Sequence, residues 1–100
     1  MSSDLRSVEQ PIARFGVSPQ QPRADQTVQL FDASSDPRGV GIAWRAWDFG
    51  DDVTATGSSP THRYAHAGAY AIMLTLATFD GRLARAVRVV KVADKSRSRS

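Results

Sequence analysis

Polar and apolar residues alternate with a period of two over much of this chain, which is the pattern of half-buried strands. The longest such stretch runs from Ala69 to Thr78. Because residues two apart share one face of a strand, this stretch predicts a central strand with one face in a core. The core residues expected on it are Tyr70, Ile72, Leu74 and Leu76.

Two earlier stretches, residues 26–31 and 42–49, repeat the pattern and predict further strands. The second is the most aromatic part of the chain and runs directly into a Gly-Asp turn. A Trp and a Phe two residues apart can anchor a small core together. The core positions that these two strands supply are Val28, Leu30, Trp47 and Phe49.

The last stretch, residues 83–92, allows two interpretations. Cations recur there every three residues, which would form a basic stripe along a helix. Four valines favour a strand instead, because β-branched side chains fit a pleated surface better than a helix. The valines change from odd to even positions, and this change predicts a bulge near Val89.

Turn-forming residues separate all of these stretches. Pro19 and Pro22 interrupt the chain after a weak edge strand over residues 12–17, and Asp80-Gly81 is typical of a tight hairpin. A short edge strand is expected around residues 53–56. About seven short strands without a helix predict an all-β fold, a sandwich of two packed sheets.

Composition adds limits. The chain has 100 residues, 41% of them apolar, and no cysteine, so one domain must be held together by packing. No apolar run is long enough to span a bilayer, and the first residues do not form a signal peptide. We expect a flexible lead-in over residues 1–10, a folded domain over 11–92 and a disordered basic tail over 93–100. Since that tail holds most of the formal charge of +3, the folded part is nearly neutral.

Four segments resemble the polycystic kidney disease (PKD) domain family. They are VQLFDASSDP from Val28, WDFGD from Trp47, PTHRY from Pro60 and AGAYAIMLTL from Ala67, and their order and spacing cover about residues 12–92. Two positions depart from the family pattern. Asp52 stands where a glycine is usual, and Arg45 stands where an aromatic residue is common.

The resemblance implies an immunoglobulin-like β-sandwich that is not itself catalytic. PKD domains are modules of surface-layer proteins, adhesins and secreted proteases, chitinases and glycosidases, where they space other domains or contact proteins and polysaccharides. It further implies that Trp47 is the core tryptophan, and that Tyr64 and Tyr70 are a pair of packed tyrosines.

Several side chains could carry chemistry. Asp32, Asp36, Asp51 and Asp52 offer oxygen ligands of the kind that Ca²⁺ prefers, although their spacing matches no dedicated calcium loop and they can equally cap turns. We therefore expect no obligatory cofactor. His62 or His66 could be imagined in a Ser-His-Asp triad, but no nucleophile motif accompanies them, so we expect no enzyme activity.

Trp44 is the most informative residue for binding. Unbroken alternation turns it away from the core, where an exposed indole could stack on a sugar ring or a protein surface. A bulge could instead turn it inward. Phe31 alternates away from Val28 and Leu30 in the same way, and if their strands were neighbours, Phe31 and Trp44 would form one patch.

Two functions of different classes follow. The first is a non-catalytic extracellular or cell-envelope module, monomeric within a larger protein, that contacts protein or polysaccharide or acts as a spacer. The second is an intracellular domain whose basic tail binds nucleic acid or an acidic partner, which would make binding steeply dependent on salt.

Overall fold

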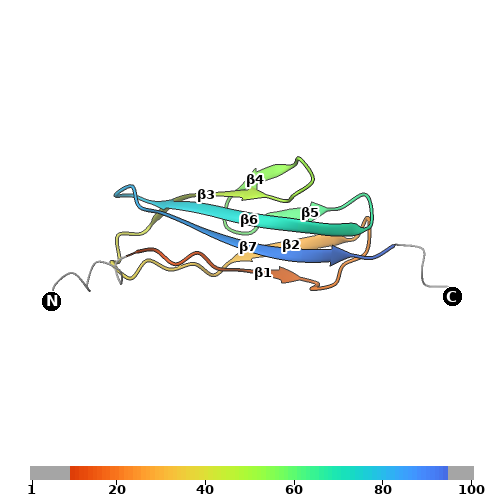
Figure 1. Cartoon of the computed structure of the whole chain (residues 1–100). Coiled ribbons are helices and arrows are strands. Elements are labelled where there is room, and N and C mark those ends of the chain that lie inside the picture. The colour runs from red at the N-terminus through yellow and green to blue at the C-terminus, as the bar shows by residue number, and fades with distance from the viewer. Residues whose placement is uncertain (1–9, 95–100) are drawn as a thin grey trace.

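The computed structural model describes residues 10–94, which form an all-β, immunoglobulin-like sandwich. A three-stranded sheet has the order β1-β2-β5, and a four-stranded sheet has the order β4-β3-β6-β7 (Figure 1). The described part of the chain includes no helix that could cross a membrane. The strands are β1 (Phe15–Ser18), β2 (Thr27–Asp32), β3 (Ile42–Asp48), β4 (Thr54–Thr56), β5 (Thr61–Arg63), β6 (Gly68–Thr78) and β7 (Leu83–Val92).

The core lies between the two sheets and is formed by the positions that alternation selects. Eight of the nine expected core residues are at most 1% exposed, and Tyr70, at the edge of the core, is half-buried and packs against it. Phe15, Val17, Val90 and Val92 complete the core from the first and last strands. The fully buried members are Val28, Leu30, Trp47, Phe49, Tyr64, Ile72, Leu74 and Leu76.

Aromatic side chains form the centre of this core. The indole of Trp47 meets the ring of Phe15 edge to face, with 5.2 Å between ring centroids, and its Nε1 donates a hydrogen bond to the Gly57 carbonyl. Tyr64 stacks on Tyr70 at 4.2 Å. The Tyr64 hydroxyl donates to the Phe49 carbonyl at 2.7 Å, so this buried polar group has a partner.

The hairpin of β6 and β7 is the longest regular unit. Its register runs without a break from Ala77 opposite Leu83 to Gly68 opposite Val92, so the bulge expected near Val89 is wrong. Val89 faces outward and Val90 inward by plain alternation, because valines occupy both faces of this strand. The one irregularity of β3 lies instead between Ile42 and Trp44.

The turn after β3 depends on two left-handed residues. Gly50 has φ of 86°, and a Cβ there would lie 2.7 Å from the Ala71 carbonyl oxygen, so β6 passes too close for any side chain. Asp52, where the resemblance implies a glycine, also has a positive φ, of 72°. The turn therefore does hold a side chain at a left-handed position.

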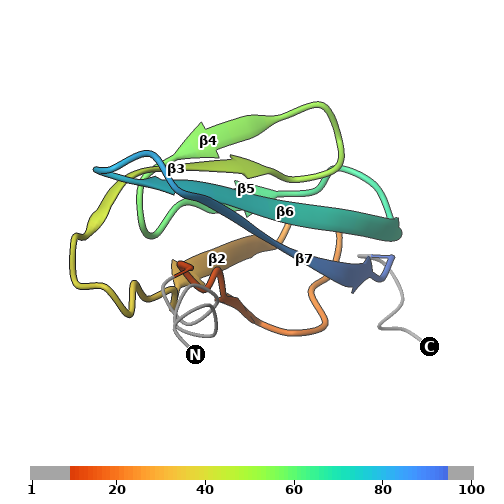
Figure 2. The same cartoon turned by 60° about the vertical axis from the view of Figure 1, so that its left-hand side comes forward.

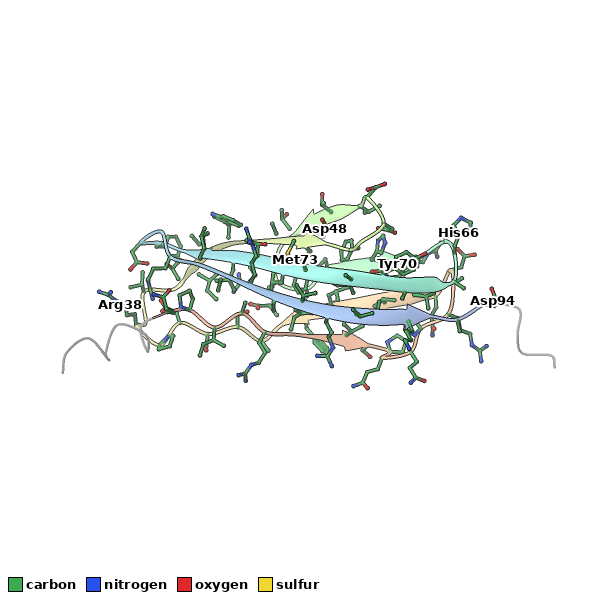
Figure 3. All side chains as sticks on the ribbon, viewed as in Figure 1. Arg38, Asp48, His66, Tyr70, Met73 and Asp94 are labelled. Atoms are coloured by element: carbon green, nitrogen blue, oxygen red, sulfur yellow. The ribbon has the colours of Figure 1, made fainter. Side chains whose placement is uncertain are left out.

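The described chain starts at one end of the sandwich and finishes at the other. Figure 3 shows Arg38, in the loop before β3, at one end, with His66 and Asp94 at the opposite end. At the far end, the Ala93 amide donates to the Pro22 carbonyl, and the Ala93 carbonyl accepts from the Ala24 amide. The folded part thus includes Ala93.

Candidate interaction surface

The side of the four-stranded sheet that faces away from β1, β2 and β5 is uncovered, and we call it the outer face. Figure 2 shows the sheet in the order β4, β3, β6 and β7. Because directly opposed residues share a face, the register identifies its members. They are Trp44, Ala46 and Asp48 of β3, Ala71, Met73, Thr75 and Ala77 of β6, and Leu83, Arg85, Val87, Val89 and Lys91 of β7.

Two tryptophans three residues apart have opposite environments. Trp47 is 1% exposed and hydrogen-bonded within the core, whereas Trp44 is 48% exposed. The irregularity at residues 42–44 does not turn Trp44 inward, since from Trp44 onward β3 pairs regularly with β6. The indole N–H of Trp44 has no partner in the range 10–94, which leaves its ring and its donor available to a ligand.

Apolar side chains from β7 extend the surface around Trp44. Leu83 shares a cross-strand row with Trp44 and Ala77, and it is 58% exposed. Val87 and Val89 continue the face along the same strand and are 62% and 61% exposed. Exposed apolar side chains that share one face of a sheet make that face the candidate interaction surface.

Leu83, Val87 and Val89 were not predicted as surface residues, although the sequence carries a signal for them. The Asp80-Gly81 turn fixes the register of the hairpin, and Ile72 and Leu74 fix which side of β6 is inside. Together these two facts turn the odd-numbered residues of β7 outward. β-branching in the valines thus predicts a strand, and the hairpin register adds the side to which each valine points.

Charged residues lie among the apolar side chains of the outer face. Arg85 and Lys91 project from β7 on the same side as the exposed valines. Asp48 lies opposite Met73, as Figure 3 shows, and its carboxylate accepts a hydrogen bond from the Gly50 amide. Arg85 lies between Leu83 and Val87 on this face, and Lys91 follows Val89, so the surface mixes apolar side chains with cations.

Phe31 does not join this surface. It lies on β2 in the other sheet, so it and Trp44 cannot form the patch that neighbouring strands would have allowed. Phe31 is 40% exposed, and its ring lies over Gly16, its direct partner on β1. A Cβ on Gly16 would lie 2.5 Å from the Phe31 ring, so the aromatic ring fills the place of the missing side chain.

The aspartates considered for calcium are held separately by other groups. Asp32 pairs with Arg45, Asp36 with Arg82, and Asp51 with the His62 ring at 2.7 Å, while Asp52 is exposed in its turn. Over residues 10–94 there is no group of three or more potential ligands that could hold a metal ion.

The Arg45–Asp32 pair explains why an arginine is accommodated near the core tryptophan. Arg45 has the same orientation on β3 as Trp47, and its Nε donates to the Asp32 carboxylate on β2, which joins the two sheets. Burial raises the pKa of Asp32, but hydrogen bonds from Ser34 and Arg45 outweigh it and bring the pKa below its ordinary value. The Asp32 carboxylate therefore has a structural role, in the contact between the two sheets.

Arg82 holds the loop before β3 to the β6–β7 turn. Its guanidinium binds both Asp36 oxygens, at 3.0 and 2.9 Å, and its Nε donates to Asp80. The Asp36 carboxylate also accepts from the amides of Val40 and Gly41. The Arg82 hydrogen bonds lower the pKa of Asp36 to about 2.

The histidines considered for catalysis take structural positions. His62 stacks on Phe49 at 4.2 Å and meets Tyr64 edge to face at 4.6 Å. His66 is exposed, and its carbonyl accepts from the Tyr70 hydroxyl. Burial, followed by the charge of Asp51, raises the pKa of Tyr64 far above its ordinary value, so this tyrosine stays protonated.

Parts of the expected organisation lie outside the described residues. They are most of the lead-in, residues 1–9, and most of the basic tail, residues 95–100. The cations considered for nucleic-acid binding, Lys95, Arg97 and Arg99, fall in this last range.

Comparison with known proteins gives similarities in sequence and in structure. A microbial collagenase of Vibrio alginolyticus is 38% identical over 60 residues, which are 60% of this chain and 7% of that protein. A chain solved in a study of promiscuous carbohydrate-binding modules of the β-sandwich superfamily superposes with a TM-score of 0.81 and 29% identity, over 86% of this chain and 35% of that chain.

A PKD domain itself is also among the similar structures. The PKD1 domain of the Vibrio cholerae metalloprotease PrtV superposes with a TM-score of 0.74 and 31% identity, over 84% of this chain and 98% of that one. The family model described as PKD domain matches residues 8–92, and the segments that resembled the family lie in strands and turns of the sandwich. This chain belongs to the PKD domain family.

Proposed function

We propose that this domain is a non-catalytic module that holds a larger extracellular or cell-envelope protein against a polymer, either a protein fibre or a polysaccharide. The observation that carries the proposal is the half-exposed Trp44 on the outer face, with Leu83 in its cross-strand row and Val87 and Val89 further along β7 on the same face. A flat apolar surface of this kind suits an extended polymer better than a small molecule, which prefers a concave site.

The similar proteins support this role. The chain spans 7% of the collagenase and 35% of the carbohydrate-binding chain, as expected for one module among several. The names of those proteins point to polymeric ligands of two kinds, and an aromatic side chain can contact either. The two opposite ends of the sandwich also suit a module that spaces its neighbours.

The test is a depletion assay of the 100-residue domain on insoluble collagen and on chitin. We expect binding to at least one polymer, and we expect Trp44→Ala to weaken it about tenfold or more, as loss of an aromatic hot spot does. Phe31→Ala is the matched control, since it removes an exposed aromatic from the opposite sheet. Equal binding by folded Trp44→Ala and the parent domain would refute the proposal.

A further inference from the structure

A second surface lies at the edge of the sandwich, apart from the outer face. β7 is an edge strand of the four-stranded sheet and β1 an edge strand of the other sheet, and no strand pairing joins them. Beyond the end of β7, Ala93 forms hydrogen bonds with Pro22 and Ala24, which follow β1 in the chain. Between β7 and β1, Arg88 reaches across, and its guanidinium donates to the Phe15 carbonyl at 3.2 Å. We call this opening the β1–β7 seam.

The backbone of β7 offers unpaired hydrogen-bonding groups to the seam. Hydrogen bonds alternate between the two edges of a strand, and the bond from the Thr78 amide to the Arg82 carbonyl shows that even-numbered residues of β7 pair with β6. Odd-numbered residues point to the other edge, as Ala93 does. No described segment pairs with the amides and carbonyls of Val87 and Val89 on that edge.

Two small cavities lie along the seam on either side of Arg88. One, of about 160 Å³, is lined on β7 by residues 88–90, and the other, of about 170 Å³, by residues 86–88. Each could hold a group about as large as benzene, such as a Val or Leu side chain. Their β7 linings are offset by two residues, about 6.6 Å along a strand, which is the repeat of side chains on one face of an extended peptide.

The charge of the seam limits its ligand. Arg14 lines one cavity and Arg88 lines both, and no acidic residue lines either one. Side chains of a bound strand that point away from the cavities would meet Arg85 and Lys91 on the other side of β7, so carboxylates there would be attracted and cations repelled. A second copy of β7 would bring its own Arg85, Arg88 and Lys91 against the cations of β7.

We propose that the β1–β7 seam binds an extended, acidic segment of a partner polypeptide, which adds a strand to the free edge of β7. The backbone of the segment pairs with Val87 and Val89, and two of its apolar side chains fill the cavities beside Arg88. Its carboxylates alternate to the opposite face of the added strand, the side on which β7 carries Arg85 and Lys91. This mode takes its affinity from main-chain hydrogen bonds and its selectivity from the side-chain cavities.

The probe is a capped heptapeptide, acetyl-TVEVEVT-amide, titrated into the ¹⁵N-labelled domain and followed by amide chemical shifts. We expect saturable shifts at residues 86–90 and 13–17. Replacing both glutamates of the peptide by lysine should abolish them. Methylation of its alternate backbone nitrogens on the pairing edge should do the same, because the peptide can then no longer donate to β7.

The decisive domain variant is Val89→Pro. It removes one amide from the free edge without removing a bond to β6, since Val89 and Ala71 form a non-hydrogen-bonded pair. We expect about tenfold weaker peptide binding, which is the effect on affinity expected for the loss of one hydrogen bond. Val89→Thr keeps the amide and should bind like the parent domain, and Arg85→Gln should weaken binding of the acidic peptide, because it removes a cation on the side that the glutamates face.

Four results would overturn the proposal. They are unchanged binding to Val89→Pro, equal binding of the lysine peptide, shifts centred on Trp44, and concentration-dependent shifts at residues 86–90 without peptide, which would identify a second copy as the occupant. Trp44→Ala is the control: it should leave peptide binding unchanged, and so it separates the seam from the outer face.

Discussion

The ring of Phe31 covers Gly16 across the β1–β2 ladder, at a point where a Cβ would be only 2.5 Å from the ring. The exposed Phe31 ring thus covers the one position of β1 that has no side chain. It serves the stability of an edge strand, while Trp44 on the opposite sheet covers no glycine.

Phe31→Ala should therefore lower the free energy of unfolding by about 1–2 kcal/mol, less than a fully buried aromatic, because 40% of the residue is exposed. Urea unfolding followed by Trp fluorescence gives the value. Polymer binding in the same variant should equal that of the parent domain. An unchanged urea midpoint would show that the ring contributes nothing to this edge.

Trp47→Ala should remove about 3–5 kcal/mol, because it empties the centre of the core and loses the edge-to-face contact with Phe15. Against a total stability of about 5–15 kcal/mol, much of the population could unfold. Trp44→Ala is the natural control and should change stability by less than about 1 kcal/mol. Circular dichroism during thermal unfolding distinguishes the two, and similar losses in both variants would contradict the assignment of faces.

Asp36→Asn should weaken the acid dependence of stability. The pKa of Asp36 is about 2 in the folded domain against an ordinary 3.8, so between these values the unfolded chain binds more protons at this position. The contribution of Asp36 is thus fully present above about pH 4 and is lost as the pH falls through about 2.

The variant should accordingly be less stable than the parent domain at pH 7, and the difference should shrink toward pH 2. Urea midpoints measured from pH 7 to pH 2 test this. Hydrogen bonds also lower the pKa values of Asp80 and, against burial, of Asp32, so some acid dependence should remain. A difference that stays constant for Asp36→Asn would contradict its role.

Asp52 provides a test of backbone conformation. At φ of 72° an aspartate costs more than a glycine, so Asp52→Gly should stabilise the domain by about 0.5 kcal/mol after the greater freedom of the unfolded chain is counted. Asp52→Ala should destabilise it by about 1 kcal/mol, because alanine tolerates the left-handed region less well. The reverse order of the two variants in urea unfolding would show that the Asp52 side chain makes a stabilising interaction of its own.

Alternation alone predicted the strands and most of the core. One face of each central strand is buried, and the period of two in the sequence shows which residues lie on that face. The same reasoning failed at Val89, since exposed valines on the outer face look like core residues in the sequence. Apolarity identifies a buried face only when the opposite face is polar.

Of the residues in the candidate site, only Trp44 was predicted from the sequence. Alternation turned Trp44 outward, but grouping it with Phe31 required knowledge of which strands pair, and β2 and β3 belong to different sheets. Long-range contacts such as Arg45 with Asp32 and Arg88 with Phe15 have no local signature either. They arise from the packing of the two sheets.

The cations that recur every three residues near the end of the chain have a consequence for solubility. On a strand this spacing sends Arg85 and Lys91 to one side and Arg88 to the other, so each side of an exposed valine run carries charge. Such residues act as gatekeepers against fibril formation by β-prone edges. Neutralising all three would leave an apolar edge strand without charges. We expect that variant to precipitate at concentrations at which the parent domain stays in solution.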